Sequence, residues 1–323
     1  MNVPDVSLIV PVRQEAATLG RFLGSLATLE PGPAEIVICD GGSTDASPDI
    51  VRRWASVDPR IRLIEDADAY PGRARNLGIL AATHEWIALT DAGTIVPPDW
   101  LHRLIEARDR SGRADVVYGT YEPILESPMQ QAAALAFLAP ARLDGGGYTR
   151  GPSTASMLMR RSVWDAVGGF PEHLRAAEDL VFFGRVARTD ARCAAAPKAA
   201  VQWQLPSSIH AVFRRFRVFS RHTLRAGLGG SWHYAVVRMY LAALAAIVLA
   251  LVHSPWWLLL PGLGFAARAW IGIWRRRPPA GPAIALRPET VPLTMLLLFV
   301  IDVAMFLGLL EWAWGRKKRY EAT

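Results

Sequence analysis

The first 125 residues alternate short apolar segments with segments of helical apolar spacing, and this alternation limits the possible folds more than any other feature. It predicts strands over residues 6–11, 35–40, 60–64, 86–91 and 116–122, and helices over residues 15–29, 47–54, 72–82 and 98–110. Strands that alternate with helices form a mostly parallel sheet covered by helices on both faces. We therefore expect an α/β fold, and sheets of this kind bind ligands at the carboxyl ends of their strands.

The last 90 residues contain three long apolar runs, over residues 239–252, 256–274 and 291–314. A helix that spans a membrane needs roughly 20 apolar residues, a length that only the third run clearly meets. The first two runs could form a tight transmembrane hairpin or a re-entrant pair. Asp302 inside the third run is costly in a membrane, and it could pair with Arg268 or line a helix bundle. We expect two to three hydrophobic helices here.

The net charge of +7 conceals two halves of opposite sign. Residues 1–190 hold 19 basic and 25 acidic residues, whereas residues 191–288 hold 13 basic residues and no acidic one. A basic segment can bind nucleic acid or an anionic membrane surface. No nucleic-acid motif accompanies it and apolar runs adjoin it, so we expect a membrane and no nucleic acid. Cys39 and Cys193 are too few for a disulfide framework.

Basic residues flank the apolar runs on every side. Arginines precede the first run, residues 275–277 follow the second, and residues 316–319 follow the third. The positive-inside rule then places all of these flanks in the cytoplasm, with a hairpin between the first two runs. A single third span cannot satisfy both of its ends, so the topology stays open. Residues 210–225, with phenylalanines among five arginines, predict an interfacial amphipathic helix or a basic helix packed on the preceding domain.

Four short polar stretches carry the residues that chemistry would need. They are Val10-Pro-Val-Arg-Gln-Glu15, Asp40-Gly-Gly-Ser-Thr-Asp45, Asp91-Ala-Gly-Thr94, and Glu178-Asp179 after Gly168-Gly-Phe-Pro171. Asp40 and Asp91 each fall at the carboxyl end of a predicted strand, so we expect both at one edge of the sheet.

With Ala74-Arg-Asn76 and Gly78 between the second and third of them, these stretches resemble family 2 glycosyltransferases of the membrane-anchored bacterial type, which have the GT-A fold. That fold is Rossmann-like, with a mostly parallel sheet flanked by helices. The family's Val-Pro-x-x-Asn-Glu turn is matched except that Gln14 replaces the usual Asn. The resemblance covers roughly residues 5–190 and implies transfer of a sugar from a nucleotide-sugar donor.

The resemblance assigns donor binding to Pro11, Val12, Glu15, Asp40, Arg75 and Asp91. Asp40 would accept hydrogen bonds from the nucleobase, and such charge-assisted bonds are strong. Arg75 would clamp the pyrophosphate, although a solvated helix face is an equal alternative. Asn76 and Gly78 are expected to shape helix packing.

The metal site departs from the family pattern. The family usually has Asp-x-Asp, and its second carboxylate helps to bind Mg²⁺ or Mn²⁺, but Gly93 stands at that position here. Magnesium keeps waters and substrate oxygens as ligands, so Asp91 and the donor phosphates could still hold it. We favour a retained metal over a dispensable one.

Asp179 is the predicted general base, which would take a proton from the acceptor hydroxyl during inverting transfer. Glu178 would bind the acceptor or hold its helix in place. Arg150 lies in a glycine-rich stretch, residues 145–151, that we interpret as a mobile acceptor loop or a plain linker. The Gln-x-x-Arg-Trp box of processive synthases is absent from the sequence, so a processive synthase is disfavoured.

The sequence thus predicts a GT-A catalytic domain (1–205), a basic interfacial segment (206–235) and a membrane domain (236–323). We expect an inverting glycosyltransferase at the cytoplasmic face of the inner (plasma) membrane, multi-pass, with a lipid-linked or surface-glycan acceptor. A catalytically impaired nucleotide-sugar-binding scaffold is the alternative, supported by Gly93. A nucleotidyltransferase would need a lysine-rich loop near the first strand, and residues 10–20 contain no lysine.

Overall fold

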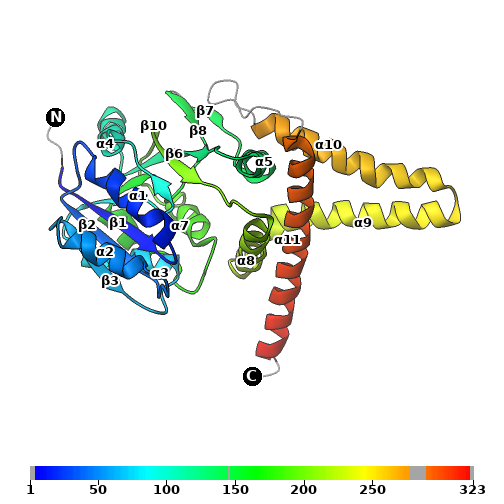
Figure 1. The fold of residues 1–323 in the computed structure, drawn as a ribbon, viewed down its shortest axis with the longest axis horizontal. Helices are drawn as coiled ribbons and strands as arrows, with labels where there is room; N and C mark the ends of the chain where they lie inside the picture. Colours follow the sequence, from blue (N-terminus) through cyan, green and yellow to red (C-terminus); the bar gives the residue numbers. More distant parts are fainter. Residues whose placement is uncertain (1–3, 145, 277–288, 321–323) are drawn as a thin grey trace. The chain divides into compact units, whose positions relative to one another are not determined.

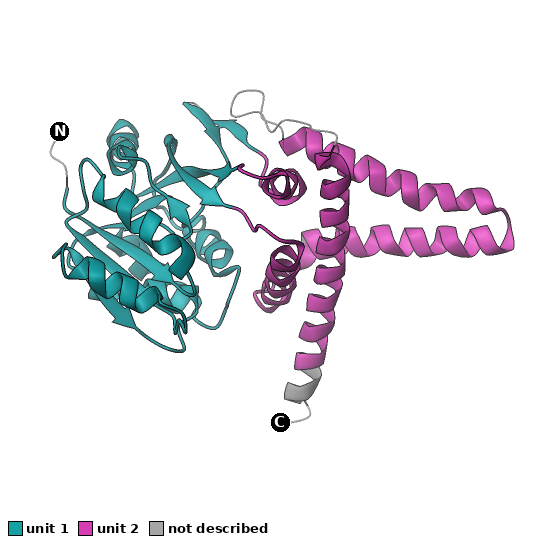
Figure 2. Cartoon of the chain, in the orientation of Figure 1, with its two compact units in different colours: residues 1–124, 141–204 teal, residues 125–140, 205–323 magenta. Residues whose placement is uncertain are grey.

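The computed structural model describes residues 4–144, 146–276 and 289–320, and the chain divides into two compact units (Figures 1 and 2). Unit 1 comprises Met1–Ile124 and Ala141–Gln204, and unit 2 comprises Leu125–Pro140 and Leu205–Thr323. The sequence predicted one continuous domain over residues 1–205. The difference is the segment 125–140, which leaves unit 1 and packs within unit 2.

Unit 1 is built on an eight-stranded sheet with the order β3-β2-β1-β4-β9-β6-β10-β5. The strands are β1 (Val6–Val12), β2 (Glu35–Asp40), β3 (Ile61–Glu65), β4 (Trp86–Leu89), β5 (Thr94–Ile95), β6 (Val116–Ile124), β9 (Met157–Arg160) and β10 (Cys193–Gln204). Neighbours β3, β2, β1 and β4 are parallel, as are β6 and β10. Strand β9 runs antiparallel to both of its neighbours, and β5 runs antiparallel to β10. The α/β class is therefore confirmed, with a mixed sheet.

Helices cover both faces of the sheet because the buried strands are apolar on both sides. They are α1 (Ala16–Ala27), α2 (Ser47–Ala55), α3 (Pro71–Ala81), α4 (Trp100–Arg110), α6 (Arg161–Ala166) and α7 (Glu178–Val186). Alternate residues of β1 face opposite cores. Leu8 packs in the core formed with α1, α2 and α4, whereas Ile9 packs in the core formed with α3, α6 and α7.

Part of the glycine-rich stretch 145–151, which we interpreted as a mobile loop or a linker, forms the second strand of a β-hairpin. Strands β7 (Arg142–Asp144) and β8 (Gly147–Thr149) pair antiparallel. Gly145 lies outside the described residues.

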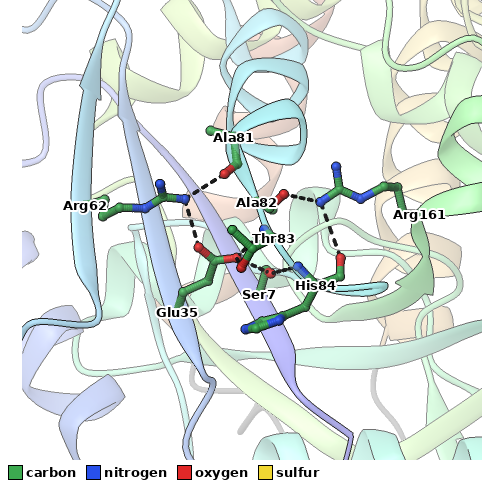
Figure 3. Close-up of polar contacts among 8 residues, drawn as sticks. All are labelled: Ser7, Glu35, Arg62, Ala81, Ala82, Thr83, His84 and Arg161. Atoms are coloured by element: carbon green, nitrogen blue, oxygen red, sulfur yellow. Dashed lines mark hydrogen bonds and ion pairs between the residues drawn. The ribbon is translucent and has the colours of Figure 1, made fainter.

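A hydrogen-bonded cluster pins the amino ends of three neighbouring strands (Figure 3). The Glu35 carboxylate, 9% exposed, accepts hydrogen bonds from the Ser7 hydroxyl (2.6 Å) and from the backbone N–H and hydroxyl of Thr83 (2.5 and 2.8 Å). Its other oxygen pairs with Arg62 at 2.8 Å. These contacts join β1, β2 and the residues before β4 at the edge opposite the carboxyl ends.

Unit 2 is helical. It contains α5 (Pro128–Phe137), α8 (Ile209–Arg225), α9 (Gly230–Val252), the 3₁₀ helix η1 (Pro255–Leu258), α10 (Leu259–Arg276) and α11 (Thr290–Tyr320). Three helical segments are long and apolar enough to cross a membrane: Trp232–Val252, Pro255–Arg276 and Thr290–Gly315. Arg277, which we counted among the flanking arginines, lies outside the described residues.

The suspected pair inside the apolar helices is confirmed. Arg268 of α10 donates two hydrogen bonds to the Asp302 carboxylate of α11, at 2.5 and 2.8 Å. The Tyr240 hydroxyl of α9 donates a third, at 3.1 Å. Asp302 is fully buried, so its charge is compensated where water cannot reach it.

Candidate active site

The carboxyl ends of β1, β2 and β4 form one edge of unit 1, because these strands are parallel neighbours. Glu15 follows β1, Asp40 ends β2 and Asp91 follows β4 by two residues. The three carboxylates therefore gather at this edge, as the strand-end positions of Asp40 and Asp91 predicted for those two.

Asp40 ends its strand in a tight turn that leaves half of its carboxylate without a partner. One oxygen accepts hydrogen bonds from the backbone N–H groups of Gly42 (3.0 Å) and Ser43 (2.8 Å). The other oxygen is buried, and the described residues supply it with no donor. A buried carboxylate oxygen without a donor is unfavourable in the free protein. It is well suited to accept a hydrogen bond from a ligand.

Gln14 fastens the turn after β1 to the turn after β2, a role that the sequence analysis missed. Its side-chain oxygen accepts hydrogen bonds from the backbone N–H groups of Thr44 (2.6 Å) and Asp45 (3.2 Å). Its own backbone N–H donates to the Ser43 hydroxyl at 2.9 Å. Gln14 has φ of 59°, which costs free energy for a residue with a side chain. The only sequence feature that could have indicated this role is that Gln14 replaces the Asn usual in the family.

Asp45 and Ser47 also connect the turns after β1 and β2. Asp45 accepts hydrogen bonds from the backbone N–H groups of Ala16 and Ser47, both at 3.0 Å, and the Ser47 hydroxyl accepts one from Glu15 N–H at 2.9 Å. Helix α2 begins at Ser47, as the helix predicted over residues 47–54 does, and the Ser47 hydroxyl serves the neighbouring turn rather than capping the helix.

Arg75 of α3 joins the acidic residues of the later motifs. It is 4% exposed, and its two terminal nitrogens donate to Glu178 at 2.6 Å and to Asp91 at 2.8 Å. Burial by itself lowers the pKa of Arg75, but the two carboxylates raise it, so the guanidinium stays charged. The alternative of a solvated helix face is wrong. A single buried cation thus links residues that are up to 103 positions apart.

Tight packing between α3 and the turn before α7 makes this link possible. The Asn76 amide bonds both the N–H and the carbonyl of Phe170, each at 2.9 Å. A Cβ on Gly72 would lie 2.3 Å from the Pro171 carbonyl, and one on Gly78 would lie 2.4 Å from Ile9. Asn76 and Gly78 therefore act in packing, as expected, and α3 can lie directly against the sheet and the turn.

Asp179 follows Glu178 at the start of α7 and is half-buried. Burial, together with the neighbouring Glu178 charge, raises the pKa of Asp179 to about 6, although the Arg75 charge opposes this rise. Burial also raises the pKa of Glu15, with Asp91 and Asp45 adding repulsion. A carboxylate with a pKa near neutrality can accept a proton and release it again, as a general base must.

The metal-binding capacity of this edge is small. No group of three His, Cys, Asp or Glu residues that could hold a metal occurs among residues 4–144, 146–276 and 289–320. Asp91 is 39% exposed in its side chain, and no atom of the described residues lies within 4 Å of a Cβ built on Gly93. The donor set fits a cation that takes one carboxylate and fills its other positions with phosphate oxygens and water.

The remaining predicted residues lie nearby or are already paired. Val12 and Pro11 end β1, and the Val12 carbonyl accepts a hydrogen bond from Gly41 N–H at 2.8 Å. Arg150 is buried, and its guanidinium donates to Glu122 at 2.7 Å and to the Tyr121 carbonyl at 3.0 Å. Its role in acceptor binding stays a prediction.

Known proteins resemble the chain over both units. Residues 7–166 match the family described as "Glycosyl transferase family 2". The succinoglycan biosynthesis protein ExoO of Rhizobium meliloti is 33% identical over 210 residues, which are 61% of this chain and 60% of that protein. ExoA of the same organism is 27% identical over 86% of this chain and 89% of that protein.

Among solved structures, the mannosyltransferase PcManGT from Pyrobaculum calidifontis in complex with GDP-Man and Mn²⁺ is 22% identical. Its TM-score is 0.57, and the match covers 94% of this chain and 87% of that one. At this identity the likeness establishes the fold. With its mixed sheet, the motif residues at the carboxyl edge and the family match, the chain belongs to glycosyltransferase family 2 and has the GT-A fold.

Proposed function

We propose that the chain is an inverting glycosyltransferase that moves a sugar from a nucleotide-sugar donor to a lipid-linked or surface-glycan acceptor. The observation that supports this most is the Arg75 cluster. It gathers Asp91, Glu178 and the raised-pKa Asp179 at the edge where one Asp40 oxygen receives no hydrogen bond from the described residues. A donor site and a proton acceptor are thereby available together.

In the proposed donor complex, Asp40 accepts a hydrogen bond from an N–H group on the nucleobase edge. Pro11 and Val12 at the end of β1, and Glu15 just after it, lie at the same edge of the sheet. Asp91 faces the pyrophosphate, and Arg75 supplies positive charge behind it. A bound Mg²⁺ or Mn²⁺ would neutralise charge on the leaving phosphates, with Asp91 as its protein ligand. PcManGT, whose complex contains GDP-Man and Mn²⁺, supports this donor class.

The proposed reaction is a single displacement at the anomeric carbon. The acceptor hydroxyl oxygen attacks this carbon, the bond to the nucleoside diphosphate breaks, and the hydroxyl proton passes to Asp179. The nucleotide leaves with the bonding electron pair. Glu178 keeps Arg75 in place and thereby holds Asp179 at the start of α7, whereas Arg150 is kept as a candidate acceptor contact.

We place this reaction at the cytoplasmic face of the inner membrane. The apolar helices of unit 2 and the basic segment beside them support membrane association. The succinoglycan biosynthesis proteins ExoO and ExoA support an acceptor in surface-polysaccharide assembly.

A donor panel tests the proposal against the scaffold alternative. The purified full-length chain is incubated with UDP-, GDP- and dTDP-sugars and a lipid extract as acceptor, with and without EDTA. Release of nucleoside diphosphate that requires both donor and extract supports an enzyme. Binding of a nucleotide sugar with no turnover on any pair would favour the scaffold.

A further inference from the structure

Helix α11 exposes a single apolar stripe, although its sequence is mostly apolar. The exposed large side chains are Leu296, Phe299, Val303, Leu307, Leu310 and Trp314, at intervals of three or four residues. This spacing places them on one face of the helix. A helix surrounded by lipid exposes apolar side chains on every face, so α11 has protein on its other faces.

Helices α5 and α8 supply much of that protein. Both pack on α11. A Cβ on Gly308 would lie 2.6 Å from the Arg217 carbonyl, so α8 and α11 are in close backbone contact. Glu311 of α11 binds Arg217 at 2.5 Å and Arg221 at 3.4 Å.

This packing limits how deep α11 can lie in a membrane. Arg214, Arg215, Arg217 and Arg225 of α8 are exposed. A path of α11 through the hydrocarbon would carry these charges into it, where an arginine side chain is unfavourable. At the lipid headgroups the same arginines meet anionic groups instead.

The α9–α10 hairpin has the opposite character. Its large side chains away from α11 are exposed in all directions, including Leu244, Leu251, Trp256 and Leu263. Helices α9 and α10 run alongside each other, and α11 runs across their direction (Figure 1). Helices in these two directions cannot both cross the same bilayer along its normal.

The Asp302 cluster marks where α11 meets the hairpin. Asp302 bonds Tyr240 in the middle of α9 and Arg268 in the middle of α10. Between these two residues and the tip of the hairpin, each arm of the hairpin contains only uncharged residues. These arms are residues 241–252 and 256–267, 12 residues each. At 1.5 Å per residue, a helical arm of this length is about 18 Å long. The hydrocarbon core is about 30 Å thick, so the arm passes its middle but not its far side.

We propose that unit 2 binds the bilayer from one side without crossing it. The α11 stripe lies in the plane of the headgroup–acyl boundary, with the α8 arginines at the anionic headgroups. The α9–α10 hairpin dips into the hydrocarbon and returns to the same face. This arrangement replaces the multi-pass topology and places the basic residues 316–319 on the same side as residues 214–225, which a spanning third helix could not do.

Depth measurements along α11 test the in-plane position. Spin labels are attached to cysteines at Leu296, Val303, Leu310 and Trp314 in a Cys39→Ala, Cys193→Ser chain, reconstituted in phosphatidylethanolamine–phosphatidylglycerol vesicles. The relative accessibility to oxygen and to a nickel chelate should report one common depth. A spanning helix would instead place the labels near its middle deepest and those near its ends close to the headgroups, and this result would overturn the proposal. Helical content and a single elution peak establish that each labelled chain is folded.

Labelling of the hairpin tip tests its depth independently of any enzymatic activity. In a chain that carries Ser254→Cys and Cys39→Ala, the native Cys193, which is exposed, reports the side of unit 1. A membrane-impermeant maleimide should label Cys193 from one side only and the tip from neither, until detergent is added. An epitope tag after Thr323 should be digested from the side on which Cys193 reacts. Labelling of the tip from the side opposite Cys193, or digestion of the tag from that side, would refute the proposal. The side that proves to be cytoplasmic tests the proposed function separately.

Discussion

Arg75 shows how a buried charge can organise a site at the scale of single residues. Its partners, Asp91 and Glu178, hold the guanidinium between α3, α7 and the end of β4. Removal of one partner of a buried ion pair leaves an uncompensated charge, which is strongly destabilising. The cluster therefore holds Asp179 in a defined place before any ligand binds.

Asp179→Asn should abolish turnover while the fold and donor binding remain. Loss of a general base lowers the rate by about 10²–10⁴-fold. Because the raised pKa of Asp179 is about 6 and the base acts when deprotonated, wild-type kcat/KM should rise with pH through about 6. Initial rates over a pH series measure this. Asp165→Asn, at an exposed position on α6, makes the same charge change and should have no effect. A fully active Asp179→Asn chain would remove Asp179 from the mechanism.

Gly93→Asp should restore the missing metal ligand. The site has room for a side chain, since the part of the chain that the structure describes leaves the space within 4 Å of a built Cβ empty. A second carboxylate should tighten binding of Mn²⁺ in the presence of donor by about tenfold, which corresponds to about 1.4 kcal/mol. Manganese titration by electron paramagnetic resonance, with donor at saturation, measures the change. Unchanged affinity in a folded Gly93→Asp chain would show that residue 93 does not face the cation.

At the scale of elements, polar clusters fix where strands and helices meet. Glu35 ties the amino ends of β1 and β2 to the residues before β4 (Figure 3). Burial by itself raises the pKa of Glu35, but hydrogen bonds from Ser7 and Thr83 and the Arg62 charge outweigh it, and the net pKa is lowered. The cluster lies away from the carboxyl edge, so it serves register rather than chemistry.

Glu35→Gln should lower the free energy of unfolding by about 1–3 kcal/mol, because buried donors lose a charged acceptor. A lowered pKa in the folded state means that the ionised group stabilises at neutral pH. This contribution is lost as the pH falls below 4.5, the ordinary value for glutamate, through the folded pKa. In thermal melts, the difference in melting temperature between wild type and variant should therefore become smaller as the pH is lowered. Glu85→Gln removes an exposed ion pair and should cost less than 1 kcal/mol.

Gly308→Ala should separate α8 from α11. The new methyl group would lie 2.6 Å from the Arg217 carbonyl and 2.7 Å from the Ser220 Cβ, neither of which can move aside without shifting α8. Overpacking of this kind costs about 1–3 kcal/mol. The melting temperature in detergent should fall. Gly315→Ala lies on the same helix, where the described residues place no atom within 4 Å of its Cβ, and it should melt like wild type. Equal melting temperatures for the two variants would contradict the close contact between α8 and α11.

At the scale of the whole molecule, the chain passes between its two units three times, after residues 124, 140 and 204. The segment 125–140 carries α5, whose buried residues pack with α10 and α11. A catalytic unit cut out as one continuous piece therefore retains an apolar helix that belongs to unit 2.

A chain that ends at Gln204 should aggregate, because α5 loses the helices that cover it. Replacement of residues 125–140 in that chain by a glycine–serine linker of equal length should yield a monodisperse unit 1, since apolar patches of this kind drive association. Size-exclusion chromatography without detergent compares the two. Aggregation of both chains, or of neither, would contradict the assignment of α5 to unit 2.

The sequence by itself determined the strand–helix order, the edge at which the motif residues gather and the apolar helices, and it offered the pairing of Arg268 with Asp302 as one of two alternatives. These features depend on local periodicity, on strand-end position and on the high cost of an unpaired charge among apolar residues. Each can be judged from neighbouring residues or from a single energetic argument.

Only the tertiary structure decided the antiparallel β9, the partners of Arg75, the hairpin at residues 142–149 and the direction of α11. A strand has the same periodicity whichever way it runs, and an arginine can reach any carboxylate that folding brings near. The sequence of an apolar helix is similar whether the helix crosses a bilayer or lies along its surface. What separates these cases is the packing of distant segments, such as α8 on α11, which no local pattern encodes.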